Sequence, residues 1–328
     1  MINLHDLAAY LEGRRVFIQT HNFPDADSIA SAFGLQYLLG TLGVEARIIY
    51  VGKIDKYNTQ QMIELLGISL MPAEQAGLQE TDAILLVDAQ KYNSNIRDCA
   101  GDEVACIDHH QIFHAPDYRF CDIRPGTGAC SSIIAGYLVE YGVEIPANLA
   151  TALLYGIKMD TADLVRGVSE LDIDMFYHVF KRADMELILK IQLNSMEFND
   201  LTSYAQAIEG IRVFDNIGIA RLDGHCPDAL IASISDFILA LVEVEIALVY
   251  NQRRDGIKLS MRSELESCNA GRVLSLALEN LGGGGGHATM AGGFIPAEKL
   301  SPDDMDAVLE ERLLGAVAEC AEEMKYPQ

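Results

Sequence analysis

The chain has 328 residues, of which 50% are hydrophobic and 22% charged, and it is long enough for two globular domains. Its 48 acidic residues outnumber 24 Lys and Arg, and the net charge of −24 disfavours binding to long nucleic acids, which depends on cations that neutralise phosphates. Neither an apolar run of about 18 residues nor a basic segment followed by an apolar core is present, so we expect no membrane span and no signal peptide.

Short apolar runs alternate with amphipathic segments through the first half of the chain. We expect strands at 15–20, 46–51, 83–87 and 104–107. We expect helices at 28–40, 58–66, 131–141 and 148–157. Asn58 is the expected cap of the second helix, and Gly67 is expected to end it. Strands and helices that alternate in this way predict an α/β fold with a doubly wound parallel sheet.

The pattern becomes more helical and more charged after about residue 163, and a second set of strands follows. We expect strands at 217–222, 245–250 and 257–262 and helices at 270–281 and 303–324, with a glycine run at 282–286. The chain is therefore expected to form a metal-binding catalytic domain over 1–187, a helical connector over 188–207 and a smaller α/β domain over 208–328. We expect a cleft between the two domains, with substrate selection by the second.

Acidic and imidazole side chains gather where four of the apolar runs end. The four groups are His21, Asp25 and Asp27; Asp88; Asp108, His109 and His110; and Asp160. Open α/β sheets collect their ligand sites at the carboxyl ends of strands. Carboxylates with imidazoles are ligands for Mn²⁺ or Mg²⁺, and also for Co²⁺ or Zn²⁺. Two such ions, about 3.5–4 Å apart, can activate a water molecule and bind a phosphoryl group.

A single aspartate at the end of a strand is more often a turn or cap residue than a metal ligand. Four groups at four such ends are hard to explain as caps. Asp88 is well placed to bridge two ions, and Asp25 and Asp27 can reach different ions because they are two residues apart. One imidazole of the His109-His110 pair can bind metal while the other reaches a phosphate oxygen.

These four groups resemble the signature motifs of the DHH phosphoesterase superfamily. The second half resembles its DHHA1 domain in three segments, which are 261–263, 282–287 and 291–293. Within the superfamily the chain is most similar to the nano-RNase and pAp phosphatase group. That resemblance implies a manganese-dependent phosphoesterase with one or both of two activities. The first hydrolyses di- to pentanucleotides to nucleoside monophosphates. The second removes the 3′-phosphate of phosphoadenosine phosphate. It implies two Mn²⁺ ions, with Mg²⁺ or Co²⁺ as alternatives, which activate a hydroxide.

The resemblance also assigns roles to residues. It implies that His21, Asp25 and Asp88 bind one ion. It implies that the other ion is bound by Asp27, Asp88, His109 and Asp160. It implies that His110 contacts the scissile phosphate and that Asp108 orients a ligand histidine. The implied substrate-binding residues are Arg262, Ser263, Gly284, Gly285, Gly286 and His287, with the glycines in a built loop whose bare N–H groups face a phosphate.

The sequence is also compatible with two other functions. One is an inorganic pyrophosphatase or exopolyphosphatase-like hydrolase, and the other is a nucleotide sensor that does not catalyse. Aromatic side chains that stack bases would favour nucleotides, whereas a second domain lined by Arg and Lys would favour pyrophosphate. The substrate preference also depends on two departures from the family pattern: Ala162 stands where a glycine is usual after Asp160-Thr161, and residues 263–271 are acidic.

We expect the partners to be short RNA or small nucleotide substrates, with no long duplex nucleic acid and no membrane. A homodimer is one candidate assembly. The seven cysteines are scattered without a C-x-x-C pair, which is typical of free thiols in the cytoplasm.

Overall fold

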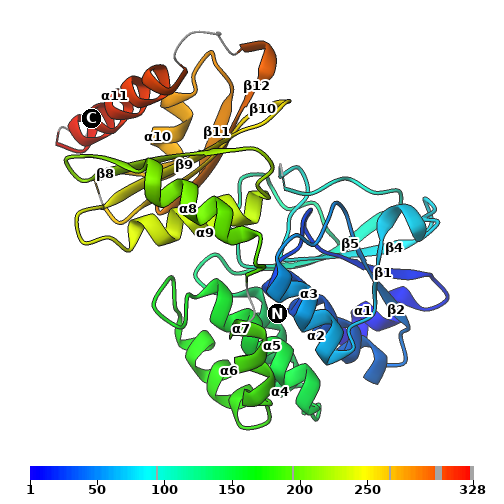
Figure 1. Ribbon diagram of the computed structural model, residues 1–328. Helices are drawn as coiled ribbons and strands as arrows, with labels where there is room; N and C mark the ends of the chain where they lie inside the picture. Colours follow the sequence, from blue (N-terminus) through cyan, green and yellow to red (C-terminus); the bar gives the residue numbers. More distant parts are fainter. Residues whose placement is uncertain (94, 194–195, 266, 300–304, 326–328) are drawn as a thin grey trace. The chain divides into compact units, whose positions relative to one another are not determined.

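The computed structural model describes residues 1–93, 95–193, 196–265, 267–299 and 305–325. The chain forms two compact units, Met1–Ser195 and Met196–Gln328, and each contains its own sheet (Figure 1). The segment 188–207, expected as a connector, includes the end of helix α7 (Met185–Leu193) in the first unit and much of α8 (Asp200–Gly210) in the second. No helix within the described ranges is both long and apolar enough to cross a membrane.

The first unit contains a six-stranded sheet in the order β3-β2-β1-β4-β5-β6, with every neighbouring pair parallel. Its strands are β1 (Val16–Gln19), β2 (Ala46–Tyr50), β3 (Leu70–Pro72), β4 (Ala83–Val87), β5 (Asp102–Asp108) and β6 (Phe120–Ile123). Its helices, besides α7, are α1 (Leu4–Leu11), α2 (Ala26–Thr41), α3 (Tyr57–Leu66), α4 (Cys130–Glu140), α5 (Ala147–Asp160) and α6 (Glu170–Phe180). The predicted parallel α/β fold is confirmed.

The helices of this unit pack on one face of the sheet and not on both. The main core joins alternate strand residues such as Ile18 and Leu85 to helices α1–α5. The opposite face, with Phe17 and Ile84, is covered by the short 3₁₀ helix η1 (Ala73–Gln75) and by loops. The connections toward β2 and β3 contain α2 and α3, which pack on the first face, whereas the described residues of the connections toward β4, β5 and β6 form no α-helix.

The start of α3 differs from the prediction, while its end agrees with it. Lys56 is the N-terminal cap residue and makes no side-chain cap hydrogen bond. Asn58 lies inside the helix, where its amide donates to the Tyr155 hydroxyl at 2.9 Å, so a tertiary contact replaces the expected cap. Gly67 ends the helix in a left-handed conformation with φ 68°, which glycine adopts without strain.

The second unit contains a mixed six-stranded sheet in the order β11-β12-β10-β9-β8-β7, in which only β8 and β9 pair in parallel. Its strands are β7 (Arg212–Phe214), β8 (Ile217–Asp223), β9 (Ile246–Gln252), β10 (Gly256–Ser263), β11 (Gly283–Gly286) and β12 (Met290–Pro296). Helices α8 and α9 (Asp228–Leu239) pack on one face, and α10 (Ala270–Ala277) and α11 (Met305–Lys325) pack on the other. Residues 303 and 304 of the predicted last helix lie outside the described residues.

The glycine run was expected to be a loop, and that expectation is wrong. Gly283–Gly286 form β11, an edge strand that pairs antiparallel with β12. The glycines are needed because the strand lies against α10: a Cβ on Gly284 would be 2.8 Å from the carbonyl oxygen of Leu274. A Cβ on Gly271 would be 2.5 Å from the carbonyl oxygen of Gly286. Close packing of two backbones therefore explains part of this run.

Candidate metal centre

The strand order of the first unit brings the four groups of polar side chains to one edge of the sheet. The chain reverses direction across the sheet between β1 and β4, and such a switch point forms a crevice at the carboxyl ends of the strands. His21 follows β1, Asp88 directly follows β4 and Asp108 ends β5. The crevice position therefore accounts for the predicted clustering.

Two groups of three potential ligands form there. In the group of His21, Asp25 and Asp88, and in that of Asp27, His109 and Asp160, the ligand atoms lie within 4.8 Å of one another. Asp88 connects the two groups, because its Oδ2 lies 3.7 Å from His21 Nε2 and its Oδ1 lies 3.2 Å from His109 Nε2. The same His109 nitrogen is 3.1 Å from Asp160 Oδ2.

His21 and His109 both direct their Nε2 atom toward the carboxylates. His21 Nδ1 lies 2.8 Å from the carbonyl oxygen of Asn22, and His109 Nδ1 lies 3.0 Å from that of Thr127. A carbonyl oxygen can only accept, so the hydrogen of a neutral ring resides on Nδ1 and the Nε2 lone pair faces the carboxylates. Metal-binding histidines are commonly held in this way.

Asp27 is held by the start of helix α4. Its two carboxylate oxygens accept from the backbone N–H groups of Cys130, at 2.7 Å, and Ser131, at 2.9 Å. The positive end of the helix dipole favours a negative charge at this place, even though Asp27 is only 1% exposed. The fold thus fixes a buried carboxylate beside His109.

Two buried atoms in the cluster suit a bound cation. Among the residues that the structure describes, Asp88 Oδ1 and His109 Nε2 have no hydrogen-bond partner of good geometry, although they lie 3.2 Å apart. Buried polar atoms without partners are costly in a protein. A divalent cation would engage both atoms, and the oxygen and nitrogen donors present match the ligands that Mn²⁺ takes.

The charges in the cluster shift the pKa values of its members. Burial lowers the pKa of His21, but the Asp25 carboxylate and then the charge of Asp88 outweigh it and raise this pKa to about 10. Burial likewise opposes protonation of His109, but Asp160 and Asp88 raise its pKa well above the usual value. Burial, followed by the charges of Asp88 and Asp160, raises the pKa of Asp27. The cluster therefore retains protons that a bound cation would displace.

His110 and Asp108 form a pair beside these ligands. His110 Nδ1 lies 2.8 Å from Asp108 Oδ1, and the other oxygen of Asp108 accepts from Gln90 Nε2 at 2.6 Å. Asp108 was expected to orient a ligand histidine. It instead contacts the ring of His110, and it reaches His109 only through the backbone N–H of that residue. Asp108 cannot reach the His109 ring nitrogen Nδ1 because that nitrogen is occupied by Thr127.

Asp160 ends α5, and the turn that follows has an unusual backbone. Ala162, Asp163 and Leu164 have φ values of 47°, 59° and 66°, all in the left-handed region. Residues other than glycine rarely adopt this region. Ala162 thus adopts a left-handed conformation at the position where the family usually has a glycine. Arg166 NH2 donates to the carbonyl oxygen of Asp160 at 2.6 Å.

Only some of the expected substrate-binding residues lie together in the second unit. Arg262, Gly286 and His287 line one groove. Ser263 is buried and accepts from the N–H of Leu265, because successive strand residues face opposite sides of a sheet. Gly284 faces α10, as described above. Gly285 is exposed and pairs with Gly292.

Sequence reasoning missed several residues that position the cluster. Gln90 lies two residues after Asp88, and its polar side chain at a buried strand end was the available signal. The contacts from Thr127 and from Cys130 involve the backbone, and Cys130 lies 103 residues from its partner Asp27. No residue pattern in the sequence identifies such contacts.

The chain matches two family models. The model described as the DHH family, N-terminal domain, matches residues 15–157, and the DHHA1 domain model matches residues 215–313.

Among related sequences, the uncharacterized protein MJ1633 of Methanocaldococcus jannaschii is 32% identical over 86% of this chain. A probable manganese-dependent inorganic pyrophosphatase of Streptococcus thermophilus is 30% identical over 45% of it. The chain spans only 58% of the length of the first relative and 48% of the second.

Solved structures share the fold. An exopolyphosphatase-related protein of Bacteroides fragilis superposes with a TM-score of 0.77, at 16% identity, over 97% of both chains. RecJ of Thermus thermophilus with Mn²⁺ superposes with a TM-score of 0.56, at 15% identity, over 97% of this chain and 55% of that one. With the two family models matched in order and the motif residues gathered at the switch point, the chain belongs to the DHH/DHHA1 phosphoesterase superfamily.

Proposed function

We propose that the protein is a metal-dependent phosphoesterase. One proposed class of substrates is di- to pentanucleotides, which it would cleave to nucleoside monophosphates. The other proposed substrate is phosphoadenosine phosphate, from which it would remove the 3′-phosphate. The observation that supports this most strongly is the position of Asp88, which presents one oxygen to each of two ligand groups. A pair of cation sites that share a carboxylate suits the hydrolysis of a phosphate ester.

In this proposal His21, Asp25 and Asp88 hold one divalent cation. The residues proposed for the other are Asp27, Asp88, His109 and Asp160. Bound cations would lower the pKa of a water molecule and offset the charge of the phosphate. Mn²⁺ is the proposed ion because relatives that match 45% of this chain are described as probable manganese-dependent pyrophosphatases.

His110 and Asp108 would contribute a positioned, positively charged group beside the phosphate. Asp108 holds the Nδ1 side of His110, so Nε2 is the nitrogen that would hydrogen-bond a phosphate oxygen. Burial lowers the pKa of His110, but Asp108 and Asp88 outweigh it and raise that pKa, which favours a protonated ring beside an anion. His110 is thus proposed as a phosphate contact and Asp108 as its positioning residue.

Exposed aromatic side chains favour a substrate that carries a base. Phe23, Tyr92 and Phe113 are 61%, 67% and 71% exposed, and they lie on the loops that follow β1, β4 and β5. Phe23 and Tyr92 also have φ values of 55° and 68°, which are strained for bulky residues. Exposed rings stack on nucleobases, and inorganic pyrophosphate offers no ring for them.

A second candidate function is the hydrolysis of pyrophosphate or polyphosphate. It draws support from the relatives described as inorganic pyrophosphatases and from the exopolyphosphatase-related structure. A nucleotide sensor without activity is disfavoured by the complete set of ligand side chains in the cluster.

Turnover of four substrates in parallel, with Mn²⁺, separates these functions. The panel is pApA, a pentanucleotide, phosphoadenosine phosphate and inorganic pyrophosphate. We expect efficient hydrolysis of the first three and little of the fourth. Preferential hydrolysis of pyrophosphate would support the second candidate, and no turnover of any substrate would support a sensor.

A further inference from the structure

The turn after α5 brings Arg166 back to Asp160. The two residues are six positions apart, and the Arg166 guanidinium donates through NH2 to the carbonyl oxygen of Asp160 at 2.6 Å. The carboxylate of the same aspartate lies 3.1 Å from His109 Nε2, within one of the two ligand groups. The guanidinium of Arg166 therefore contacts the backbone of a proposed cation ligand.

Thr161 holds this turn together. It is fully buried, and its carbonyl oxygen accepts from the N–H groups of Val165, at 3.0 Å, and Arg166, at 2.9 Å. Its hydroxyl accepts from the N–H of Leu164 at 3.1 Å. Residues 162–164 close the turn with left-handed φ values. Backbone strain of this kind persists only where surrounding contacts enforce it, and it is common at functional sites.

The chain beyond Arg166 is also fixed. Asp172 is buried and accepts from the N–H groups of Ser169 and Gly128, both at 2.8 Å. Gly128 directly follows the residue whose carbonyl oxygen holds His109. The turn that carries Arg166 and the loop that orients His109 therefore belong to one hydrogen-bonded network.

Arg166 is the exception among the half-buried lysines and arginines of the first unit. Within the part of this unit that the structure describes, the others each form an ion pair with a carboxylate; they are Arg14, Lys91, Arg124 and Lys158. Arg166 forms no ion pair with a described carboxylate, and its one side-chain hydrogen bond uses one of five N–H donors. An unpaired charge that is partly removed from water is costly, so this position suits an anionic ligand.

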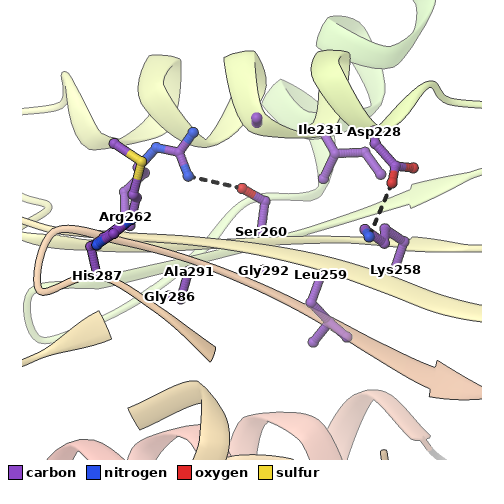
Figure 2. A pocket seen from close by; sticks show the side chains of 12 residues that line it. Asp228, Ile231, Lys258, Leu259, Ser260, Arg262, Gly286, His287, Ala291 and Gly292 are labelled. Carbon is purple, nitrogen blue, oxygen red and sulfur yellow. Dashed lines mark hydrogen bonds and ion pairs between the residues drawn. The ribbon is translucent and has the colours of Figure 1, made fainter. Parts of the chain in front are cut away.

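Arg262, the expected substrate contact of the second unit, is held differently. Its Nε pairs with Asp236 Oδ1 at 2.5 Å, and its NH1 donates to Ser260 Oγ at 3.1 Å, a contact that Figure 2 shows. A carboxylate that already binds a guanidinium competes with a phosphate for the same N–H donors. No described carboxylate competes in this way for Arg166.

The proposed cation sites need positive charge from other groups to bind a phosphate. Their four carboxylates carry as much negative charge as two divalent cations carry positive charge. His110 supplies one further positive group when its ring is protonated. A guanidinium stays charged at every pH at which the protein is folded, and its planar fork matches the oxygens of a phosphate.

We propose that Arg166 is a second phosphate contact beside His110. The hydrogen bond to the Asp160 carbonyl would hold the guanidinium in place while its remaining N–H donors bind phosphate oxygens. This inference rests on the phosphoesterase activity proposed above and makes it more specific, because the reacting phosphate would be held by residues of the first unit. Inorganic phosphate, which contains the group common to all the proposed substrates, should therefore bind in an Arg166-dependent way.

Calorimetric titration of the Mn²⁺-loaded full chain with inorganic phosphate tests this without turnover. Arg166→Gln should weaken phosphate binding at least about tenfold, which corresponds to about 1.4 kcal/mol. Arg166→Lys should recover part of the loss, because lysine keeps the charge but lacks the fork. The Mn²⁺ content of both variants should equal that of the wild type, because the ligand side chains are unchanged.

The matched control is Arg47→Gln. Arg47 is an exposed arginine of the same unit near the start of β2, at the opposite end of the sheet from the cluster, so phosphate binding should not change. Wild-type phosphate affinity in Arg166→Gln, or no phosphate binding to the wild type, would overturn the proposal. Loss of Mn²⁺ from Arg166→Gln would also overturn it, because Arg166 would then act by positioning Asp160.

The outcome is separable from that of the proposed function. Arg166-dependent phosphate binding without hydrolysis of any substrate in the panel would leave this contact standing and reject the phosphoesterase. Hydrolysis of pApA by Arg166→Gln with wild-type kcat/KM would retain the phosphoesterase and reject the contact.

Discussion

Asp88 differs from most other carboxylates of the first unit in its backbone conformation. It directly follows β4 with a φ of 57°, in the left-handed region that aspartate and asparagine tolerate better than most residues. Its N–H donates to the carbonyl oxygen of Ile107 at 3.0 Å, so neighbouring β5 holds this turn in place. The strained backbone directs the carboxylate toward both His21 and His109.

We predict that Asp88→Asn abolishes hydrolysis of every substrate while the fold survives. The amide keeps the size and the left-handed tendency of aspartate but removes the charge that two cations would share. Loss of a supporting residue around a metal costs up to about a hundredfold, so loss of a shared ligand should cost more. Steady-state kinetics and circular dichroism measure the two effects.

The matched control is Asp163→Asn. Asp163 also has a positive φ, of 59°, but it pairs with Lys158 and belongs to none of the ligand groups found among the described residues. It should keep wild-type activity. A folded Asp88→Asn protein with substantial turnover would show that Asp88 does not bridge.

The sequence predicts which side chains of the site lie together, but not which contacts hold each side chain in place. The types and places of His21, Asp25 and Asp88 follow from motif residues at strand ends. The contact between Asp108 and His110 depends on ring orientation, which residue types do not encode. Ser263 was misassigned because strand alternation turns it away from the groove that Arg262 lines.

Helices α4 and α5 approach each other closely around Asp27. A Cβ on Gly156 of α5 would lie 2.4 Å from Ser131 Oγ and 3.0 Å from Asp27 Oδ1. We predict that Gly156→Ala displaces the carboxylate, costs about 1–3 kcal/mol of stability through overpacking, and lowers Mn²⁺ content and activity together. Urea unfolding and metal analysis of the purified variant measure these changes.

Gly136→Ala in α4 is the comparison for this variant. Its Cβ would meet Leu171 Cδ1 at 3.6 Å, an ordinary contact, so the exchange should stabilise the helix by about 0.5–1 kcal/mol and leave activity intact. Wild-type metal content in Gly156→Ala would contradict the tight arrangement of α4, α5 and Asp27.

Asp122 on β6 connects the sheet to α4. It accepts from the Arg124 guanidinium at 2.9 and 2.7 Å and from the Tyr137 hydroxyl at 2.6 Å. Burial raises its pKa, but Arg124 and Tyr137 outweigh burial and lower it below the usual value. Stability from this carboxylate is therefore present above its unfolded pKa, about 3.9, and is lost as pH falls through the folded value.

We predict that Asp122→Asn lowers the free energy of unfolding by about 1–3 kcal/mol at pH 7. The difference from wild type should begin to shrink below about pH 4, where Asp122 of the unfolded chain becomes protonated, and should vanish as pH falls through the lower pKa of the folded state. Urea unfolding at pH 7, 5 and 3.5 measures it, with the exposed Glu12→Gln as control. A difference that stays constant with pH would show that charge at Asp122 does not stabilise the fold.

Element types were more predictable than their contacts. Alternation of apolar runs predicted the parallel sheet, and Gly67 predicted the end of α3. The glycine run became a strand because pairing with β12 and packing against α10 decide its conformation, and both partners are distant in sequence from the pattern that suggested a loop. β3, β6 and β7, of three or four residues each, are too short for a periodic signal.

The whole molecule is strongly acidic, with a net charge of −24. A long strand would meet repulsion from this surface and gain few phosphate contacts in return. The groove that Arg262, Gly286 and His287 line in the second unit has room for about one nucleotide unit. Both properties favour short substrates over long ones.

We predict that kcat/KM falls steeply as RNA length grows beyond about five nucleotides, because further nucleotides add repulsion without adding contacts in the groove. Product analysis with RNAs from dimer to 24-mer, at low and at physiological salt, measures this. The decline should be weaker at high salt, where surface charges are screened. Equal efficiency on dimers and 24-mers would point to a channel for long strands.

An electron paramagnetic resonance titration with Mn²⁺ measures directly whether the cluster around Asp88 binds two cations. We expect two Mn²⁺ per chain at saturation, with a spin-coupled spectrum, because two ions that shared Asp88 would lie at the spacing of about 3.5–4 Å that is typical of two-metal sites. Asp88→Asn should remove the coupled spectrum, and Asp163→Asn should retain it. A single uncoupled Mn²⁺ per chain, or no tight binding to the wild type, would contradict the two-cation site.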